Sequence, residues 1–297
     1  MSDGSTIEWL SFPGYQPASW NPVRGCSRVS NGCTRCYAER MAARFSKPGM
    51  WGHGVAEMRR GKARWTGLVQ LYEAKLLLPL KWKKPRCIFV NSTSDLFHEK
   101  LPDAAINKVF AVMQACPQHL FIVLTKRSAR MREYVNGEGA ANAAFNNFAW
   151  PLPNVILGVS VEDRAALYRL DDLRATPAAC RMISLEPLLE DLGDIDLTGI
   201  GWAVTGGESG RNARPTHPDC FRSVRDQCKE AGVPFFFKQH GEWLATADDN
   251  GEISYGGHER HGWDIDGPHE AWAYRVGKKR AGRLLDGREH NEFPGMG

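Results

Sequence analysis

The sequence predicts an α/β fold in which parallel strands curl into a complete or partial (β/α) barrel. Short apolar runs rich in β-branched and aromatic residues alternate with helical stretches along the chain. Each run is continuously apolar, as in strands that are covered on both faces. An alternating strand–helix order implies a parallel sheet, and right-handed crossovers curl six or more such units into a barrel.

Six apolar runs supply the predicted strands, in chain order 86–92, 119–125, 154–160, 180–186, 200–206 and 233–239. Helices are predicted between them at 102–116, 163–176 and 217–232. The last of these closes with Gly232 and Pro234, which are helix stop signals.

With 297 residues, the chain is long enough for one large barrel domain over residues 1–240. Residues 241–297 are then a C-terminal extension that covers the barrel or its edge. No charged leader precedes an apolar stretch, and no apolar run approaches the ~18 residues of a membrane span. We therefore expect a cytoplasmic protein with no membrane partner.

Polar side chains follow every predicted strand. Functional residues of a (β/α) barrel gather at the carboxyl ends of its strands. Polar strand ends occur in many α/β proteins, but an acid or lysine recurs here at the same offset in six consecutive units. The residues that would ring this mouth are Ser94, Asp95, Lys126, Arg127, Glu162, Glu186, Glu208, Arg211, Lys238 and Gln239.

Positive charge is concentrated near the N-terminus. Residues 21–86 hold fifteen Lys and Arg against three acids, a local balance of +12 in a chain whose net charge is +4. Four tryptophans accompany this segment, namely Trp20, Trp51, Trp65 and Trp82. A basic, aromatic surface suits a polyanion with exposed bases, so the segment favours nucleic-acid contact. The alternative is a solvated face above core tryptophans.

Three of the eight cysteines, Cys26, Cys33 and Cys36, stand within eleven residues as C-x6-C-x2-C. Thiolates at such spacing bind iron or zinc. A structural zinc needs four ligands, and no fourth Cys or His stands at finger-like spacing. Three ligands ahead of a barrel leave one iron of a [4Fe–4S] cluster open for S-adenosylmethionine. Spacing alone leaves both metals open.

Residues 20–42, "WNPVRGCSRVSNGCTRCYAERMA", resemble the signature of phage and prophage three-cysteine proteins placed among the radical S-adenosylmethionine enzymes. The similarity continues through "NSTSDLFHE", "LTKR", "GVSVED", "SLEPLL" and "FFFKQHGEW", and so covers nearly the whole chain. The first cysteine gap is longer than in the commonest C-x3-C-x2-C pattern. The resemblance implies a barrel of the radical S-adenosylmethionine type, with a [4Fe–4S] cluster on the three cysteines. It also implies S-adenosylmethionine as cofactor and an electron donor such as flavodoxin or ferredoxin.

The resemblance also implies a setting, because members of that family occur in phages that hypermodify thymine. The implied activity is an isomerase, similar to an aminomutase, that rearranges an amino-acid-substituted thymine in the host cytoplasm. Its substrate is DNA or a modified thymine nucleotide. A base in duplex DNA must be flipped out to reach a barrel mouth.

The cofactor-binding residues follow from this resemblance. Tyr37 directly follows the third cysteine, where radical enzymes place an aromatic ring beside the adenine. Carboxylates accept hydrogen bonds from amino and ribose hydroxyl groups, which makes Asp95 and Glu162 candidates for those contacts. The predicted set is completed by Glu186, which also suits a structural acid, and by Gly206 and Gly207.

Arg211 and Arg214 stand in one loop, and guanidinium groups capture carboxylates or phosphates with two hydrogen bonds. The predicted substrate-binding residues are Arg211, Arg214, Lys238 and Gln239, and the predicted catalytic residues are Lys126 and Glu208. Two other functions remain open on sequence grounds. One is a zinc-binding, nucleic-acid-binding protein, and the other is a metal-dependent nucleotide or base hydrolase that uses the strand-end acids.

Overall fold

The computed structural model describes residues 5–145, 149–246, 259–263 and 272–295. The chain divides into two compact units. Unit 1 comprises residues 1–160 and 168–182, and unit 2 comprises residues 161–167 and 183–297. The fold is α/β, with the parallel strands and strand–helix order of a partial (β/α) barrel, as predicted. The predicted division into a barrel over 1–240 and an extension over 241–297 stays a prediction.

Unit 1 holds four neighbouring parallel strands in the order β1-β6-β7-β8. Their bounds are β1 (Gln16–Trp20), β6 (Arg86–Val90), β7 (Leu120–Thr125) and β8 (Val155–Ser160). The first residues of β9 (Cys180–Leu185) also belong to this unit, and Gly158 of β8 lies against Met182. Every residue of β8 is buried, which explains its continuous apolar run.

The helices of unit 1 confirm two of the predictions. Their bounds are α2 (Glu73–Leu76), α3 (Asp103–Gln114), α4 (Ser128–Tyr134), α5 (Ala140–Phe145) and α6 (Tyr168–Arg174). In α3 the buried residues Ile106, Val109, Phe110 and Met113 recur at helical spacing and form its inner face. Single turns of 3-10 helix cover Glu8–Leu10, Asn31–Cys33, Pro79–Lys81 and Arg164–Ala166, and a π-helix covers Val135–Gly139.

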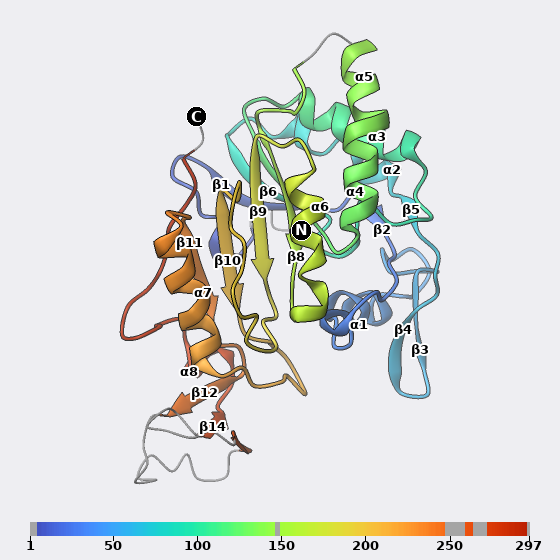
Figure 1. Cartoon of the computed structure of the whole chain (residues 1–297). Helices are drawn as coiled ribbons and strands as arrows, with labels where there is room; N and C mark the ends of the chain where they lie inside the picture. The colour runs from blue at the N-terminus through green and yellow to red at the C-terminus, as the bar shows by residue number, and fades with distance from the viewer. Residues whose placement is uncertain (1–4, 146–148, 247–258, 264–271, 296–297) are drawn as a thin grey trace. The chain divides into compact units, whose positions relative to one another are not determined.

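The N-terminal part of unit 1 carries a helix and a hairpin that lie together (Figure 1). The helix is α1 (Tyr37–Arg44), and the hairpin consists of β3 (Ala56–Arg59) and β4 (Lys62–Trp65). Its turn residues Arg60 and Gly61 have φ angles of 49° and 73°, as a two-residue hairpin turn requires. Nearby, β2 (Val23–Arg24) pairs antiparallel with β5 (Gln70–Leu71).

Unit 2 contains the last residues of β9, followed by β10 (Trp202–Gly206) and β11 (Phe235–Gln239). The strands β10 and β11 are parallel, and α7 (Pro218–Glu230) connects them as predicted. Thr205 Oγ1 donates to the carbonyl of Leu185 at 3.1 Å, which joins β10 to β9. Phe236 and Phe237 of β11 are buried in the core of this unit.

The C-terminal part of unit 2 begins with a three-stranded antiparallel sheet in the order β12-β14-β13. Its elements are β12 (Trp243–Thr246), β13 (Arg260–Gly262) and β14 (Trp272–Arg275), followed by α8 (Lys278–Ala281). The tail then runs along β11, where Phe237 N donates to His290 O at 3.0 Å and Glu292 N donates to Phe235 O at 3.2 Å. This tail covers the outer edge of β11. Among the described helices, none has the length and apolar character needed to cross a membrane.

Candidate functional site

The three clustered cysteines lie in the loop between β2 and α1 of unit 1. Cys26 follows Gly25, whose φ is +89° and whose Cα is so close to Leu68 that a Cβ would lie 2.0 Å from its carbonyl oxygen. Cys33 ends a 3-10 turn, and Cys36 directly precedes α1. All three thiols are free and half-buried. The three side chains are therefore partly accessible on one loop.

The three thiols are close enough to influence one another electrostatically. Burial and then the charge of Asp95 raise the pKa of Cys26 to about 12, with smaller contributions from Cys36 and Cys33 in the same direction. Burial also raises the pKa of Cys36, while the backbone amides of Glu39 and Ala38 lower it. The donor set is therefore three mutually interacting soft sulfur ligands on one short loop, which suits an iron–sulfur cluster.

Within the described residues, no group of three or more His, Cys, Asp or Glu side chains is placed to hold a metal ion. A [4Fe–4S] cluster is built from several irons, and each cysteine thiolate binds one of them. Cys26, Cys33 and Cys36 lie on one loop, and their number and ligand type fit three of those positions.

Arg127, the residue before α4, ties the cysteine loop to the strand ends. Its side chain is 4% exposed. Nε donates to Glu99 at 2.8 Å, and Nη1 donates to Asp95 at 2.9 Å and lies 3.8 Å from Cys26 Sγ. Nη2 donates to both the carbonyl and the hydroxyl of Ser27, at 3.1 and 2.8 Å. Burial alone would lower the pKa of Arg127, but Asp95 and Cys26 raise it, so the guanidinium stays charged.

Asp95 is the acid on which this network converges. Its Oδ1 accepts from Thr125 Oγ1 at 2.7 Å and from the amide of Phe97 at 3.0 Å. Its Oδ2 accepts from Arg127 and, at 3.3 Å, from the amide of Lys126. A carboxylate has about four acceptor positions, and here each oxygen has two donors. Asp95 therefore fixes the ends of two strands and Arg127, while its predicted contact with the cofactor stays a prediction.

His98 and Ser27 are functional candidates that the sequence did not single out. His98 is 2% exposed, accepts from the amide of Lys100 at Nδ1, and therefore donates from Nε2 to Ser27 Oγ at 2.8 Å. Burial and then Arg127 lower the pKa of His98, which keeps the ring neutral. His98 is the histidine of "NSTSDLFHE", which the sequence displays, but its partner Ser27 lies 71 residues earlier in the chain and only the fold brings the two together.

Tyr37 and Lys126 also lie beside the cysteines in unit 1. Tyr37 opens α1, is 52% exposed, and donates its hydroxyl hydrogen bond to the carbonyl of Ser92. Burial raises the pKa of Cys36, and the charge of Lys126 acts on it in the opposite direction.

In unit 2 two ion pairs occupy the predicted polar positions. Lys238 Nζ lies 2.5 Å from Glu186 Oε1, with both side chains about one-fifth exposed. The backbone amide and Nε of Arg214 donate to Glu208 Oε2 at 2.8 and 2.9 Å, and Nη2 donates to Oε1 at 2.6 Å. Glu208 and Arg214, predicted as catalytic and substrate-binding residues, are therefore partners of each other.

Of the two predicted glycines of unit 2, Gly207 has a structural reason for its small size. A Cβ on Gly207 would lie 2.0 Å from the carbonyl oxygen of His240, and one on Gly206 would lie 3.3 Å from that of Gln239. The loops after β10 and β11 therefore approach too closely for a side chain at Gly207. Gln239 is 3% exposed and donates to Ser209 at 2.7 Å, whereas its Oε1 is buried without a hydrogen-bond partner in the described residues.

Glu162 and Arg211 complete the predicted set in unit 2. Glu162 is fully buried, and its backbone carbonyl accepts from the amide of Leu189 at 2.9 Å. Arg211 is exposed in the loop that also carries Arg214.

The basic N-terminal segment exposes its charge on the β3–β4 hairpin. Trp20 and Trp82 are buried, so these two tryptophans belong to the core and not to a base-stacking surface. Trp51 and Trp65 are partly buried against Ala42 and its neighbours. At the hairpin tip Arg59, Arg60 and Lys62 are exposed, and the side chain of Arg59 is 73% exposed.

Fold and site define an α/β protein with a three-cysteine loop next to the strand ends of a parallel sheet. The chain belongs to the family described as "Protein of unknown function (DUF5131)", whose model matches residues 4–294. No curated protein matches it. Among solved structures it is similar to a cysteine-to-serine mutant of spore photoproduct lyase, with 10% identity and a TM-score of 0.38, over 92% of this chain and 72% of that chain.

Proposed function

We propose that this chain is a radical S-adenosylmethionine enzyme whose Cys26, Cys33 and Cys36 hold a [4Fe–4S] cluster. The observation that carries the proposal is the presence of three half-buried, mutually interacting thiols on one loop of unit 1. Arg127 supports it, because its guanidinium lies beside Cys26 and binds the backbone of Ser27. The sequence resemblance in the cysteine loop points to the same chemistry.

When bound, the cluster supplies the electron that cleaves S-adenosylmethionine and so starts radical chemistry. Tyr37 has the exposure needed to pack against the adenine. Lys126 lies near Cys36 and is our candidate for a catalytic cation. Asp95 and Arg127 tie the cysteine loop to the strand ends and so orient it there.

The unit 2 residues are proposed to serve the cofactor and the substrate. Glu162, Glu186, Gly206 and Gly207 are the cofactor candidates, and Arg211, Arg214, Lys238 and Gln239 are the substrate candidates, with Glu208 as a catalytic candidate. The buried Oε1 of Gln239 supports this role, because it has an acceptor position to offer to an N–H or O–H donor. The Glu186–Lys238 pair offers both a cation and a carboxylate beside it.

We propose a modified thymine as substrate, rearranged within its amino-acid substituent, in DNA or as a nucleotide, with flavodoxin or ferredoxin as electron donor. This rests on the sequence resemblance to proteins of thymine-modifying phages, and it would place the enzyme in the host cytoplasm. The exposed cations of the β3–β4 hairpin support a polyanionic partner. Hydrogen abstraction, migration of the amino group and return of the hydrogen leave the mass of the base unchanged.

Anaerobic purification followed by iron, sulfide and zinc analysis tests the cluster. We expect one [4Fe–4S] cluster per chain and its brown chromophore, lost on replacing Cys26, Cys33 or Cys36 with Ala. Cys180→Ala is the matched control, because Cys180 is another half-buried free thiol of unit 1 outside the loop. Tight binding of one zinc, with neither iron nor sulfide, would instead support the zinc-binding alternative.

The reaction is tested with reduced, cluster-loaded enzyme, S-adenosylmethionine and DNA that contains glycine-substituted thymine. Digestion to nucleosides should yield an isomer of equal mass and altered chromatographic retention. Unchanged substrate, under conditions where 5′-deoxyadenosine forms on another molecule, would exclude this substrate and leave the radical chemistry standing.

Nucleic-acid contact is tested separately by DNA binding of the unloaded protein at several salt concentrations. Each phosphate contact contributes roughly −0.9 to the slope of log K against log salt. Replacing Arg59 and Arg60 with Ala should flatten that slope by about 2 if both contact phosphates. Lys108→Ala is the control, since Lys108 is an exposed cation that pairs with Glu73. An unchanged slope in the hairpin variant would place any DNA contact elsewhere.

A further inference from the structure

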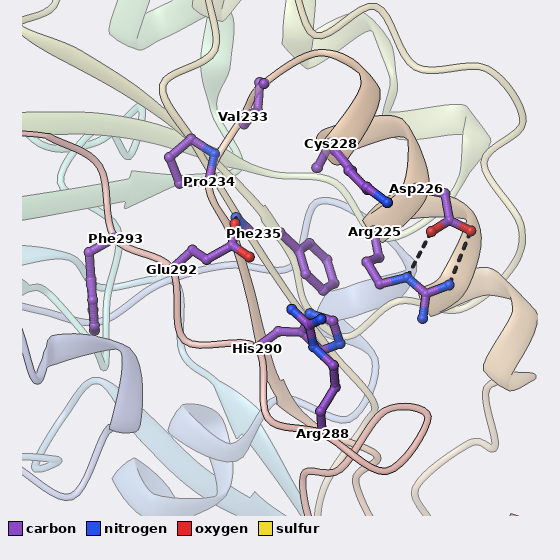
Figure 2. A pocket seen from close by; sticks show the side chains of 12 residues that line it. Arg225, Asp226, Cys228, Val233, Pro234, Phe235, Arg288, His290, Glu292 and Phe293 are labelled. Atoms are coloured by element: carbon purple, nitrogen blue, oxygen red, sulfur yellow. Dashed lines mark hydrogen bonds and ion pairs between the residues drawn. The ribbon is translucent and has the colours of Figure 1, made fainter.

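A cavity of about 700 Å³ opens in unit 2 at the amino end of β11 (Figure 2). It lies between the end of α7 and the C-terminal tail, and Cys228, Phe235 and His290 are among its lining residues. Lys238 and Gln239 stand at the other end of the same strand. The volume is in the range of small-molecule sites, so the cavity is large enough for a ligand separate from the proposed radical chemistry.

His290 gives this cavity a buried, unused hydrogen-bond acceptor. The residue is 4% exposed, and its Nε2 is buried with no partner among the described residues. The ring forms another hydrogen bond with the backbone of Leu285, and this bond raises the pKa of His290. A bond that raises this pKa is one in which the ring N–H donates, so its acceptor is the carbonyl of Leu285. Burial, followed by Arg288 and Arg225, lowers the pKa further than this bond raises it, so the ring is neutral. A neutral ring that donates from Nδ1 keeps a lone pair on Nε2.

Two cations line the same cavity without a direct ion pair. Lys229 and Arg288 are exposed, and within the described part of the chain neither side chain forms a hydrogen bond or salt bridge. Arg225 differs, because Asp226 and Asp286 hold its guanidinium. Glu292 is also engaged, since its Oε2 accepts from the amide of Phe235 at 3.0 Å. The groups left to bind a ligand are therefore Lys229, Arg288 and Nε2 of His290.

We propose that this cavity binds a small organic phosphate monoester. Its phosphate lies against Lys229 and Arg288, and a hydroxyl or N–H group of its organic part donates to Nε2 of His290. Two cations favour a phosphate monoester over a carboxylate, because the ester carries between one and two negative charges at neutral pH. The rings of Phe235 and Phe293 line the wall and suit a planar organic group such as a base.

Calorimetric titration of the full chain without its cluster tests this proposal independently of the radical chemistry. The probes are adenosine 5′-monophosphate and ribose 5-phosphate, with inorganic phosphate and adenosine for comparison. We expect at least one ester to bind at least tenfold more tightly than both inorganic phosphate and adenosine. Only the ester engages the two cations, Lys229 and Arg288, together with His290. No ester binding at millimolar concentration, or inorganic phosphate binding as tightly as both esters, would overturn the proposal.

Variants locate the binding. Arg288→Ala and Lys229→Ala should each weaken ester binding about tenfold, the loss of one charge-assisted hydrogen bond. His290→Phe keeps a ring beside Phe235 and should remove the preference for the ester over inorganic phosphate. Lys279→Ala is the control, an exposed cation of unit 2 outside the cavity. Ester binding that is unchanged in both Arg288→Ala and Lys229→Ala would overturn the proposal, whether or not the His290 variant folds.

Discussion

Both units carry charged residues where their strands end, but the Asp95–Arg127 pair of unit 1 and the Glu186–Lys238 pair of unit 2 are held in different ways. In unit 1 Asp95 receives four hydrogen bonds, and its partner Arg127 has a 4% exposed side chain with every nitrogen engaged. In unit 2 Lys238 and Glu186 have only each other among the contacts described, with side chains 17% and 20% exposed. Beside them, Gln239 Oε1 has no partner in the described residues.

The difference separates groups that hold the protein in place from groups that are available to a ligand. Breaking one contact of the Asp95–Arg127 network leaves a buried charge, so that network resists rearrangement. A partly exposed ion pair is worth little in water and exchanges partners at low cost. The Asp95–Arg127 network therefore fixes the position of the cysteine loop, whereas the Glu186–Lys238 pair and Gln239 of unit 2 offer groups that a bound molecule is able to recruit.

The largest effect is expected from Asp95→Ala. This change leaves Arg127 without its most buried counter-ion and leaves Thr125 Oγ1 and two backbone amides without an acceptor. Loss of one partner of a buried ion pair typically costs about 3–5 kcal/mol. We expect a loss of that size in the free energy of unfolding of the metal-free protein, measured with urea, and a lower iron content after reconstitution.

Asp171→Ala is the matched control for Asp95. Asp171 pairs with Arg174 through a side chain that is 76% exposed, so its removal should cost no more than about 1 kcal/mol. If Asp95→Ala proves equally mild and retains full iron content, the Asp95–Arg127 network does not position the cysteine loop. Asp95 would then be free to take the cofactor-binding role that the sequence suggested.

The positions of most strands were accessible from the sequence because they depend on local composition. The six continuous apolar runs match β6 to β11, each trimmed by a few residues. The strand β1 was missed, because "QPASW" has no continuous apolar run. This strand lies at one end of the strand order of unit 1, and its residues alternate between at least partly exposed and buried toward its end. The β3–β4 hairpin was missed for a similar reason, since its strands are highly charged and all but one of their residues are exposed or partly exposed.

Gly207→Ala probes the close approach of two loops in unit 2. The new Cβ would lie 2.0 Å from the carbonyl oxygen of His240, and backbone must move to admit it. Overpacking of this kind costs about 1–3 kcal/mol. We expect that loss in the free energy of unfolding, measured with urea. Gly295→Ala, which meets nothing within 4 Å, should be neutral. A neutral Gly207→Ala would show that the loops have room, and would favour a ligand-binding reason for this glycine.

The candidate site was only partly accessible from the sequence. The three cysteines are visible as a local cluster, and Asp95 and Lys126 as strand-end residues. The position of Arg127 against Ser27 and Cys26 depends on contacts across about one hundred residues of chain, which no local pattern encodes. Glu208 and Arg214 each have many possible partners in the sequence, and only the folded loop brings these two side chains together.

The smallest effect is expected at the Glu186–Lys238 pair, which tests whether unit 2 holds its charges loosely. Lys238→Met, Glu186→Gln and the double variant form a cycle that isolates their coupling energy. With side chains about one-fifth exposed, the pair should contribute roughly 0.2–1 kcal/mol to the free energy of unfolding, and less at high salt. A coupling above about 3 kcal/mol would instead match a buried pair such as Asp95–Arg127. In that case the two units would hold their strand-end charges equally firmly, and Lys238 would not be available to recruit a substrate.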